Sequence, residues 1–281
     1  MATDKSKNKD YNSIIIPEKP AIVFDEKIFG RTLVVADLHI GYLYGKNRKG
    51  IIVPAAQSVE EDLLKLVEEI KCKRVIILGD FKDEIYGGSH PLAGRIWKFL
   101  RALLEKSEVT IIKGNHDGKI EEFVPEEVEI IPPSGLRVIE TQKKRSIGMW
   151  HGHATPALDV LSSDITLSAH AHPAYSFREE TGAKITEKVW VRAKWKDSTD
   201  KGKQRVHIII PTFNRYIDGY SVDEELFETT VMMKEAIDLE NAEVFNLEGV
   251  LIGTIGELKE ARRTIIKKIK ERRKELLKTK S

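Results

Sequence analysis

Short apolar runs alternate with amphipathic stretches along the first half of the chain. Runs dominated by apolar residues, which predict buried strands, lie at 21–24, 31–36, 75–78 and 109–112. The first two are separated by a polar turn and predict a hairpin-like entry to a sheet. Apolar residues at a spacing of three or four predict one helix that Pro54 opens and that runs to Ile70, and a second over 92–106. Two successive strand-helix units favour a parallel or mixed sheet with helices on its faces.

The second half of the chain is richer in strand patterns. We expect strands at 128–131, 136–139, 146–150, 165–169, 206–210, 243–246 and 250–253, a hairpin arm over 184–195, and a short helix over 156–161. An ordered loop near the site is expected over 40–53, and a polar loop over 196–204. With no internal repeat and no clear linker, we predict a disordered segment over 1–13, one domain over 14–256 and a basic helix over 257–281.

Composition narrows the class of protein. Hydrophobic residues make up 41% and charged residues 32% of the 281 residues, as in a soluble globular protein. No apolar run approaches the ~20 residues that span a bilayer, and the polar start has no signal core, so we expect a cytoplasmic protein that does not bind membranes. The single cysteine, Cys72, excludes an intrachain disulfide and a cysteine-based metal cluster. Any metal must therefore be held by oxygen and nitrogen atoms.

Polar clusters follow five of the predicted strands. They are Asp37 with His39, Asp80 with Asp83, Asn115 with His116 and Asp117, His151 with His153, and His170 with His172. Each alone could be a solvated turn, with Asp117 for example capping a helix. Together they hold six of the eight histidines. Because ligands bind beyond the carboxyl ends of strands in open α/β sheets, we expect the five clusters to meet in one site.

These motifs resemble those of the calcineurin-like metallophosphoesterase superfamily. The resemblance rests on Asp37-Leu38-His39, Gly79-Asp80 with Asp83, Gly114-Asn115-His116-Asp117, His151-Gly152-His153 and His170-Ala171-His172. It implies a mixed α/β sandwich of two packed sheets flanked by helices. The runs 36–42 and 211–214 resemble archaeal phosphoesterases related to the SbcD repair nuclease. Ala169 stands where the family usually has glycine, which should be tolerated unless the backbone there needs a positive φ.

The resemblance also implies a role for each residue. Asp80 would bridge two divalent cations, with Asp37, His39 and His172 completing the first site and Asn115, His151 and His170 the second. Mn²⁺ is favoured, with Fe or Zn²⁺ as alternatives, because the donors are oxygen and nitrogen. His116 would stabilise the phosphoryl group or protonate the leaving oxygen, with Asp117 orienting its ring. Asp83 and His153 would steer the ligands.

The substrate is read from the basic C-terminal segment. Residues 257–281 contain 11 Lys and Arg and 4 Asp and Glu, a net charge of +7, which leaves −5 for the rest of the chain. A thin apolar stripe of Leu258, Ile265, Ile269 and Leu276 predicts a helix with a basic face. The basic side chains expected to meet nucleic-acid phosphates are Arg262, Arg263, Lys267, Lys270 and Lys274. A solvated helix face or a coiled coil is the alternative.

Three functions stay open on the sequence alone. We favour cleavage of nucleic-acid phosphodiesters, and Trp190 and Trp195 would then stack on bases unless they anchor the arm to the core. The second reading is a phosphodiesterase or phosphatase for small molecules such as nucleotides or cyclic nucleotides. The third is a non-catalytic binding module. A homodimer or an ATPase partner is implied only by the resemblance.

Overall fold

The computed structural model describes residues 14–48, 58–84, 90–178, 181–196, 205–224 and 231–278. The segment 1–13, predicted to be disordered, lies outside these residues, as do Pro54 and most of the predicted loop 196–204.

The first half of the sheet begins with an antiparallel hairpin of β1 (Ala21–Glu26) and β2 (Gly30–Val35). Three strands then add in parallel next to β2, in the order β3 (Arg74–Leu78), β4 (Glu108–Ile112) and β5 (Glu129–Ile131). β3 is buried along its whole length. Strands covered on both faces are expected to be continuously apolar, as this one is from Val75 to Leu78.

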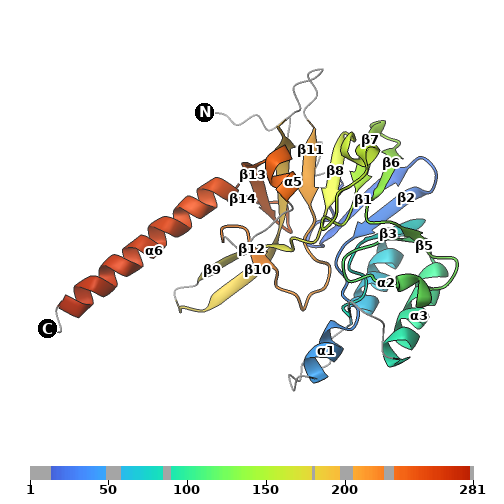
Figure 1. Cartoon of the computed structure of the whole chain (residues 1–281), viewed down its shortest axis with the longest axis horizontal. Coiled ribbons are helices and arrows are strands. Elements are labelled where there is room, and N and C mark those ends of the chain that lie inside the picture. The colour runs from blue at the N-terminus through green and yellow to red at the C-terminus, as the bar shows by residue number, and fades with distance from the viewer. Residues whose placement is uncertain are drawn as a thin grey trace.

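Two helices cover the outer face of this half. They are α2 (Val59–Ile70) and α3 (His90–Leu104), whose apolar sides pack on the alternate strand residues that point toward them, such as Val35 and Ile77. Ser58 caps α2 in a reciprocal pair with Glu61, so the helix begins after Ser58. Figure 1 shows both helices on one side of the sheet.

The second half of the sheet has its own parallel core. β7 (Arg145–Met149), β8 (Ile165–Ser168) and β11 (Val206–Ile209) are parallel neighbours. β6 (Leu136–Glu140) joins this half to the first, pairing antiparallel with β7 and touching β1 through Glu26 and Glu140. The 14 strands of the described residues therefore form one hydrogen-bonded mixed sheet.

The two halves pack face to face on one apolar core. Val34 and Ile76 of the first half belong to the same buried cluster as Ile147, Leu167 and Ile208 of the second. Residues next to Val34 and Ile76 in sequence face α2 and α3 instead, as the two-residue period of a strand requires. The predicted α/β fold, a mixed sheet flanked by helices, is confirmed.

The remaining elements extend both halves. They are α1 (Tyr42–Arg48), the 3-10 turn η2 (Ile120–Glu122), α4 (Leu158–Leu161), β9 (Pro173–Arg178), β10 (Lys184–Trp195), β12 (Tyr220–Ser221), α5 (Val231–Ala236), β13 (Ile237–Asn246), β14 (Leu251–Thr254) and α6 (Ile255–Lys278). The predicted loop over 40–53 thus contains a helix. The predicted arm is one long strand that pairs with β9, β11 and β13. Trp190 and Trp195 are buried in it, so they anchor the strand to the core and the predicted base stacking is wrong.

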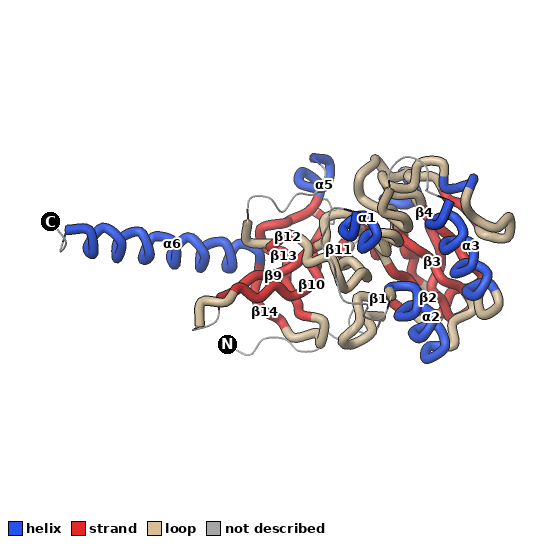
Figure 2. Tube along the Cα trace, turned by 90° about the horizontal axis from the view of Figure 1, so that it is seen from below, coloured by secondary structure: helices blue, strands red, loops and turns tan. Residues whose placement is uncertain are grey.

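Helix α6 leaves the body after its first turns. Ile255 and Leu258 are buried against β13 and β14, whereas Ile265 and Ile269 are exposed. Figures 1 and 2 show the rest of the helix projecting away from the sheet.

Candidate metal centre

Five loops that follow sheet strands meet at one edge of the folded sheet. Asp37 follows β2 and Asp80 follows β3, and the two loops continue the sheet through Asp37 N to Gly79 O at 3.1 Å and His39 N to Asp80 O at 2.8 Å. In the second half, Ala169 N donates to His151 O at 2.9 Å. The loops are thus ordered extensions of parallel strands, which is why residues distant in sequence meet here.

The first group of donor atoms belongs to Asp37, His39 and His172. One donor atom from each lies within 4.8 Å of the others. His172 Nε2 lies 3.4 Å from Asp37 Oδ1. These are the three residues predicted to complete the first metal site.

The second group joins Asp80, His151 and His170 within the same 4.8 Å limit. Asp80 lies between the two groups: its Oδ2 is 3.7 Å from His39 Nε2 and 3.6 Å from His151 Nε2. Its Oδ1 accepts a hydrogen bond from His116 N at 2.9 Å, which fixes the carboxylate. The position suits a bridging ligand, and that role stays a prediction.

Carboxylates dominate the electrostatics of the cluster. Burial alone would lower the pKa of His39 and His151, but the nearby carboxylates of Asp37, Asp80 and Asp83 outweigh it and raise both values. Burial alone would raise the pKa of Asp37, but the imidazoles of His172 and His151 hold it far below its usual range. The site therefore carries buried negative charge that favours cations.

Unsatisfied atoms test whether a metal fits. Among the described residues, both ring nitrogens of His39 and Nε2 of His172 are buried without a hydrogen-bond partner. Buried polar atoms without partners are rare, and each asks for an explanation such as an ion. Imidazole nitrogens beside carboxylate oxygens, with no thiolate, form a donor set for a divalent cation such as Mn²⁺, Fe²⁺ or Zn²⁺. The residues present fit the predicted metals.

The ligand loops are held in a strained backbone conformation. Five of the residues in the two groups have left-handed φ values between 42° and 66°: Asp37, His39, Asp80, His170 and His172. Such a conformation costs a non-glycine residue roughly 1–2 kcal/mol. Strain of this kind persists only where surrounding contacts hold it, and it gathers at functional sites. Ala169 is not among the left-handed residues, so alanine is tolerated there.

Two glycines let the loops approach closely. Gly79 has φ +76°, and a Cβ there would lie 2.3 Å from the His151 ring. A Cβ on Gly114 would lie 2.2 Å from the Asp80 amide nitrogen. No larger residue fits at either position without moving a predicted ligand.

His116 faces the cluster with a defined ring orientation. Its Nδ1 lies 2.5 Å from the carbonyl oxygen of Asp83, and its Nε2 lies 3.9 Å from Asp80 Oδ2. Because a carbonyl oxygen only accepts hydrogen bonds, Nδ1 must hold the proton. The carbonyl of Asp83 therefore orients the ring, a role that we predicted for Asp117.

Asp117 does something else. Its carboxylate is fully buried and accepts hydrogen bonds from the main-chain nitrogens of Phe81, Lys82 and Gly114, at 3.0, 3.3 and 2.8 Å. Burial raises its pKa in spite of these bonds. The prediction that Asp117 orients His116 is thus corrected: its side chain joins the loop after β3 to the loop after β4.

Lys82 makes a second bond between these loops, which the sequence did not reveal. It is fully buried, and its Nζ donates to the main-chain oxygens of His116, at 2.5 Å, and Glu84. From the sequence, a lysine between Asp80 and Asp83 would be predicted to be exposed to solvent. Its side chain is buried because of the conformation of the loop, which the sequence does not show.

The remaining predicted residues surround the two groups. Asp83 Oδ1 lies 3.4 Å from His39 Nδ1, and His153 Nδ1 lies 2.9 Å from His151 Nδ1. Burial and the neighbouring His151 and His170 lower the pKa of His153 to about 4, so it is neutral at pH 7. Asn115 is exposed, and no hydrogen bond described for its side chain joins it to the cluster. Its role as a ligand stays a prediction.

The predicted basic face of α6 changes in one respect. Arg262 is bound by Asp223 at 3.3 Å and Glu224 at 2.7 Å, so it fastens the helix to the body, and its contact with nucleic acid stays a prediction. Arg263, Lys267 and Lys270 are exposed. The side chain of Lys274 lies outside the described residues.

A family profile described as calcineurin-like phosphoesterase matches residues 30–239. The match spans most of the chain and includes all five motifs, so the protein belongs to the calcineurin-like phosphoesterase family. Its members in general are metal-dependent hydrolases of phosphoric esters. No curated protein matches the chain. None of the described helices is long and apolar enough to cross a bilayer.

Several solved structures are similar to this one. The nuclease MPE of Pseudomonas putida is 18% identical, with a TM-score of 0.46, and the match covers 77% of this chain and 84% of that chain. The phosphoesterase Yfce from E. coli is 14% identical, with a TM-score of 0.37, covering 79% and 96% of the two chains. Vps29 from Entamoeba histolytica, complexed with Zn²⁺, is 14% identical, with a TM-score of 0.29, covering 67% and 79%. No substrate or metal is carried over from these similarities.

Proposed function

We propose that the protein is a two-metal phosphodiesterase that cleaves nucleic acid. The observation that carries the hydrolytic part is the meeting of two donor groups, Asp37 with His39 and His172 and Asp80 with His151 and His170, in a chain that the family profile matches. The resemblance of 36–42 and 211–214 to archaeal SbcD-related phosphoesterases supports the nuclease reading. A cytoplasmic location, and a homodimer or an ATPase partner, belong to the same proposal.

The two groups would hold two divalent cations, Mn²⁺ first, with Asn115 added to the second and Asp80 shared. Bound there, the cations would polarise the phosphoryl oxygens and activate a water as nucleophile. Asp37 and Asp80 must be ionised for this, and the low pKa of Asp37 meets that need at neutral pH.

His116 would serve the leaving group. With Nδ1 bonded to the carbonyl of Asp83, a second proton on the ring sits on Nε2, the atom that faces Asp80. From there it can be donated to a phosphoryl oxygen or to the leaving oxygen. The backbone bond keeps Nε2 directed at the reacting phosphate throughout.

The exposed basic face of α6 would hold the substrate strand. Arg263, Lys267 and Lys270 follow one another at spacings of four and three, which places them on one side of the helix. Neutralised phosphates release counterions, so affinity should fall with salt in proportion to the number of contacts.

The experiment incubates the purified protein with Mn²⁺ and compares single-stranded DNA, RNA, cyclic nucleotides and phosphomonoesters. We expect cleavage of a nucleic acid. Changing Arg263, Lys267 and Lys270 together to Gln should lower the slope of log affinity against log salt concentration by roughly 2 units, because each phosphate contact on a single strand contributes ~0.7. The matched control changes the exposed Lys27, Lys73 and Lys144 to Gln. These residues lie at the edge of the sheet opposite the edge that carries the metal centre. Activity confined to small esters would contradict the nucleic-acid substrate, and an unchanged slope in the helix variant would contradict the role proposed for the basic face of α6.

A further inference from the structure

The loop from Asp37 to His39 carries two predicted ligands in left-handed conformations, with φ values of 54° and 42°. Three sets of contacts hold it. One is the loop after β3, through the main-chain bonds already described, and a second is the amide of Phe213, which donates to Ala36 O at 2.8 Å.

The third hold comes from side chains in the Pro211-Thr212-Phe213-Asn214 motif. Thr212 Oγ1 donates to the carbonyl of Asp37 at 2.9 Å, and Asn214 Nδ2 donates to the carbonyl of Leu38 at 2.8 Å. Both donors are buried. The motif follows β11, so it reaches the first ligand loop from the other half of the sheet.

Lys188 in turn holds the motif. Its Nζ donates to the carbonyl of Thr212 at 2.8 Å and to the carbonyl of Asn214 at 2.6 Å. These are the same two residues whose side chains hold the ligand loop. Burial lowers the pKa of Lys188 to about 7 in spite of the nearby carboxylates of Asp218 and Asp37. Burying an ammonium group costs free energy unless it is hydrogen-bonded, and the carbonyls of Thr212 and Asn214 accept its hydrogen bonds.

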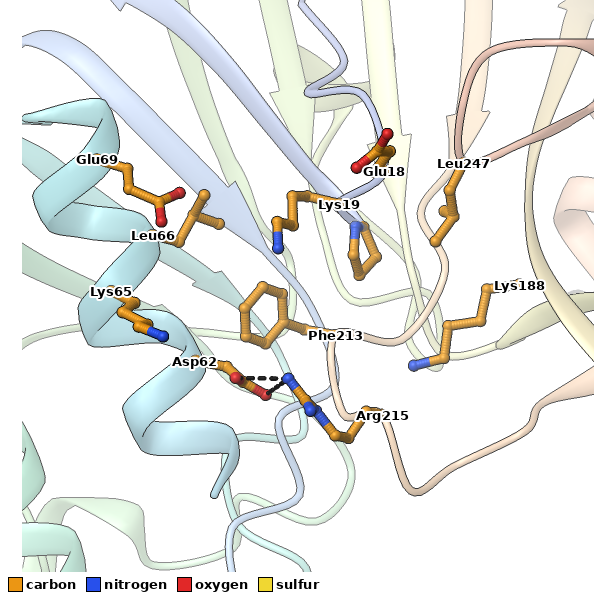
Figure 3. Close-up of a pocket in the computed structure, with 11 residues that line it drawn as sticks. Glu18, Lys19, Asp62, Lys65, Leu66, Glu69, Lys188, Phe213, Arg215 and Leu247 are labelled. Atoms are coloured by element: carbon orange, nitrogen blue, oxygen red, sulfur yellow. Dashed lines mark hydrogen bonds and ion pairs between the residues drawn. The ribbon is translucent and has the colours of Figure 1, made fainter. Parts of the chain in front are cut away.

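A cavity of about 420 Å³ lies beside this arrangement. Figure 3 shows Lys188 and Phe213 on its wall, with Arg215 paired to Asp62 of α2. The Arg215 to Asp62 distance is 2.6 Å, so the residue that follows Asn214 is fixed as well. Lys65 lines the same cavity but makes no described bond to the motif, which makes it a matched control.

We propose that Lys188, Thr212 and Asn214 are positioning residues that keep Asp37 and His39 in the geometry that binds the first metal. The inference rests on the metal part of the proposed function and assigns a role to a motif that the site itself leaves unexplained. It differs from a purely structural role, because it predicts loss of metal affinity beyond any loss of stability.

The test measures Mn²⁺ affinity by titration calorimetry and denaturant unfolding in EDTA, on variants of the full chain. Thr212→Val removes the hydroxyl donor at nearly constant shape and should weaken one of the two Mn²⁺ binding steps about 10- to 100-fold, as removal of supporting partners of metal ligands does. Lys188→Met should act in the same direction. Thr212→Ser keeps the donor and should restore wild-type affinity.

Two controls separate positioning from stability. Ser107→Ala removes a similar buried bond, Ser107 Oγ to Cys72 O at 2.8 Å, at the opposite end of β4, and should lower the unfolding midpoint without changing Mn²⁺ affinity. Lys65→Met should change neither. In the EDTA-treated protein, amide exchange of residues 36–40 should be faster in Thr212→Val than in Ser107→Ala.

The outcomes are distinct. If the wild-type protein binds Mn²⁺ and both Thr212→Val and Lys188→Met bind it with the same affinity, this inference alone is overturned. A wild-type protein that binds no Mn²⁺ would overturn both the inference and the proposed two-metal chemistry. Mn²⁺ binding with no cleavage of nucleic acid would overturn only the substrate.

Discussion

The ring of His116 is tied to the main chain of Asp83, with 2.5 Å between Nδ1 and the carbonyl oxygen. The bond is to the backbone, so it survives substitution of the Asp83 side chain. It also leaves His116 Nε2 as the atom turned toward Asp80. The proposed roles are therefore testable separately, with His116 acting on the substrate and Asp80 binding the metals.

We expect His116→Ala to lower turnover of a nitrophenyl phosphodiester by about 10² to 10⁴-fold in Mn²⁺, the usual contribution of a positioned acid or base. Metal content, measured by elemental analysis, should stay at the wild-type value. A His116→Ala protein with wild-type turnover would show that the imidazole does not act on the substrate.

Metal binding should stabilise the fold by mass action. At a free Mn²⁺ concentration about 100 times Kd, a single site adds about 2.7 kcal/mol to the free energy of unfolding. Asp80→Ala should lose most of this gain, because Asp80 faces both donor groups. Thermal unfolding with Mn²⁺ and with EDTA measures the difference, and an equal gain in wild type and variant would exclude Asp80 as a shared ligand.

Gly79→Ala should damage the metal site although Gly79 is no ligand. The added Cβ would lie 2.3 Å from the ring of His151, so the ring must move. Gly30→Ala is a close control, since its φ of +77° matches the +76° of Gly79 and no atom lies within 4 Å of the added Cβ. We expect a stability loss of about 1 kcal/mol in both from the left-handed backbone, and loss of Mn²⁺ affinity only in Gly79→Ala. Equal affinities in the two variants would contradict the close approach.

Acid should destabilise the protein through His207, a buried residue of β11. Its nitrogens pair with Thr166 Oγ1 and Ser168 Oγ, and burial lowers its pKa to about 3. As pH falls below about 6.5, His207 is protonated in the unfolded chain but stays neutral in the folded chain. The free energy of unfolding that neutral His207 contributes above pH 6.5 is therefore lost progressively toward pH 3.

The expected loss from His207 is about 2 kcal/mol between pH 7 and pH 5. Urea unfolding of wild type and His207→Gln at both values isolates it, since glutamine keeps polar groups near Thr166 and Ser168 without titrating. The variant should lose less stability over this range. The same decline in both proteins would mean that His207 is not buried and neutral.

The ligand clusters could be predicted from the sequence because each is local to one strand end. Asp37 and Asp80 directly follow apolar runs, and parallel strands bring their carboxyl ends to one edge. The strands of the first half are short, continuous apolar runs, so their predicted bounds are close to those in the structure. The usual rules for strand-helix units predicted a parallel or mixed sheet, but not the order of its strands.

The contacts between loops could not be predicted in this way. Thr212 and Asp37 are 175 positions apart, and their bond depends on how the two halves of the sheet fold together. Asp117 had the right neighbours for an imidazole partner, but its loop turns the carboxylate toward backbone amides. The helix at Tyr42–Arg48 was missed because it has only seven residues and no repeating apolar face.

The central claim is that two cations lie among these side chains, and anomalous diffraction from a crystal grown with Mn²⁺ tests it most directly. We predict two anomalous peaks per chain, one bordered by Asp37, His39 and His172, the other by His151 and His170, with Asp80 touching both. A map without peaks there, or with a single peak that Asp80 does not touch, would contradict the account.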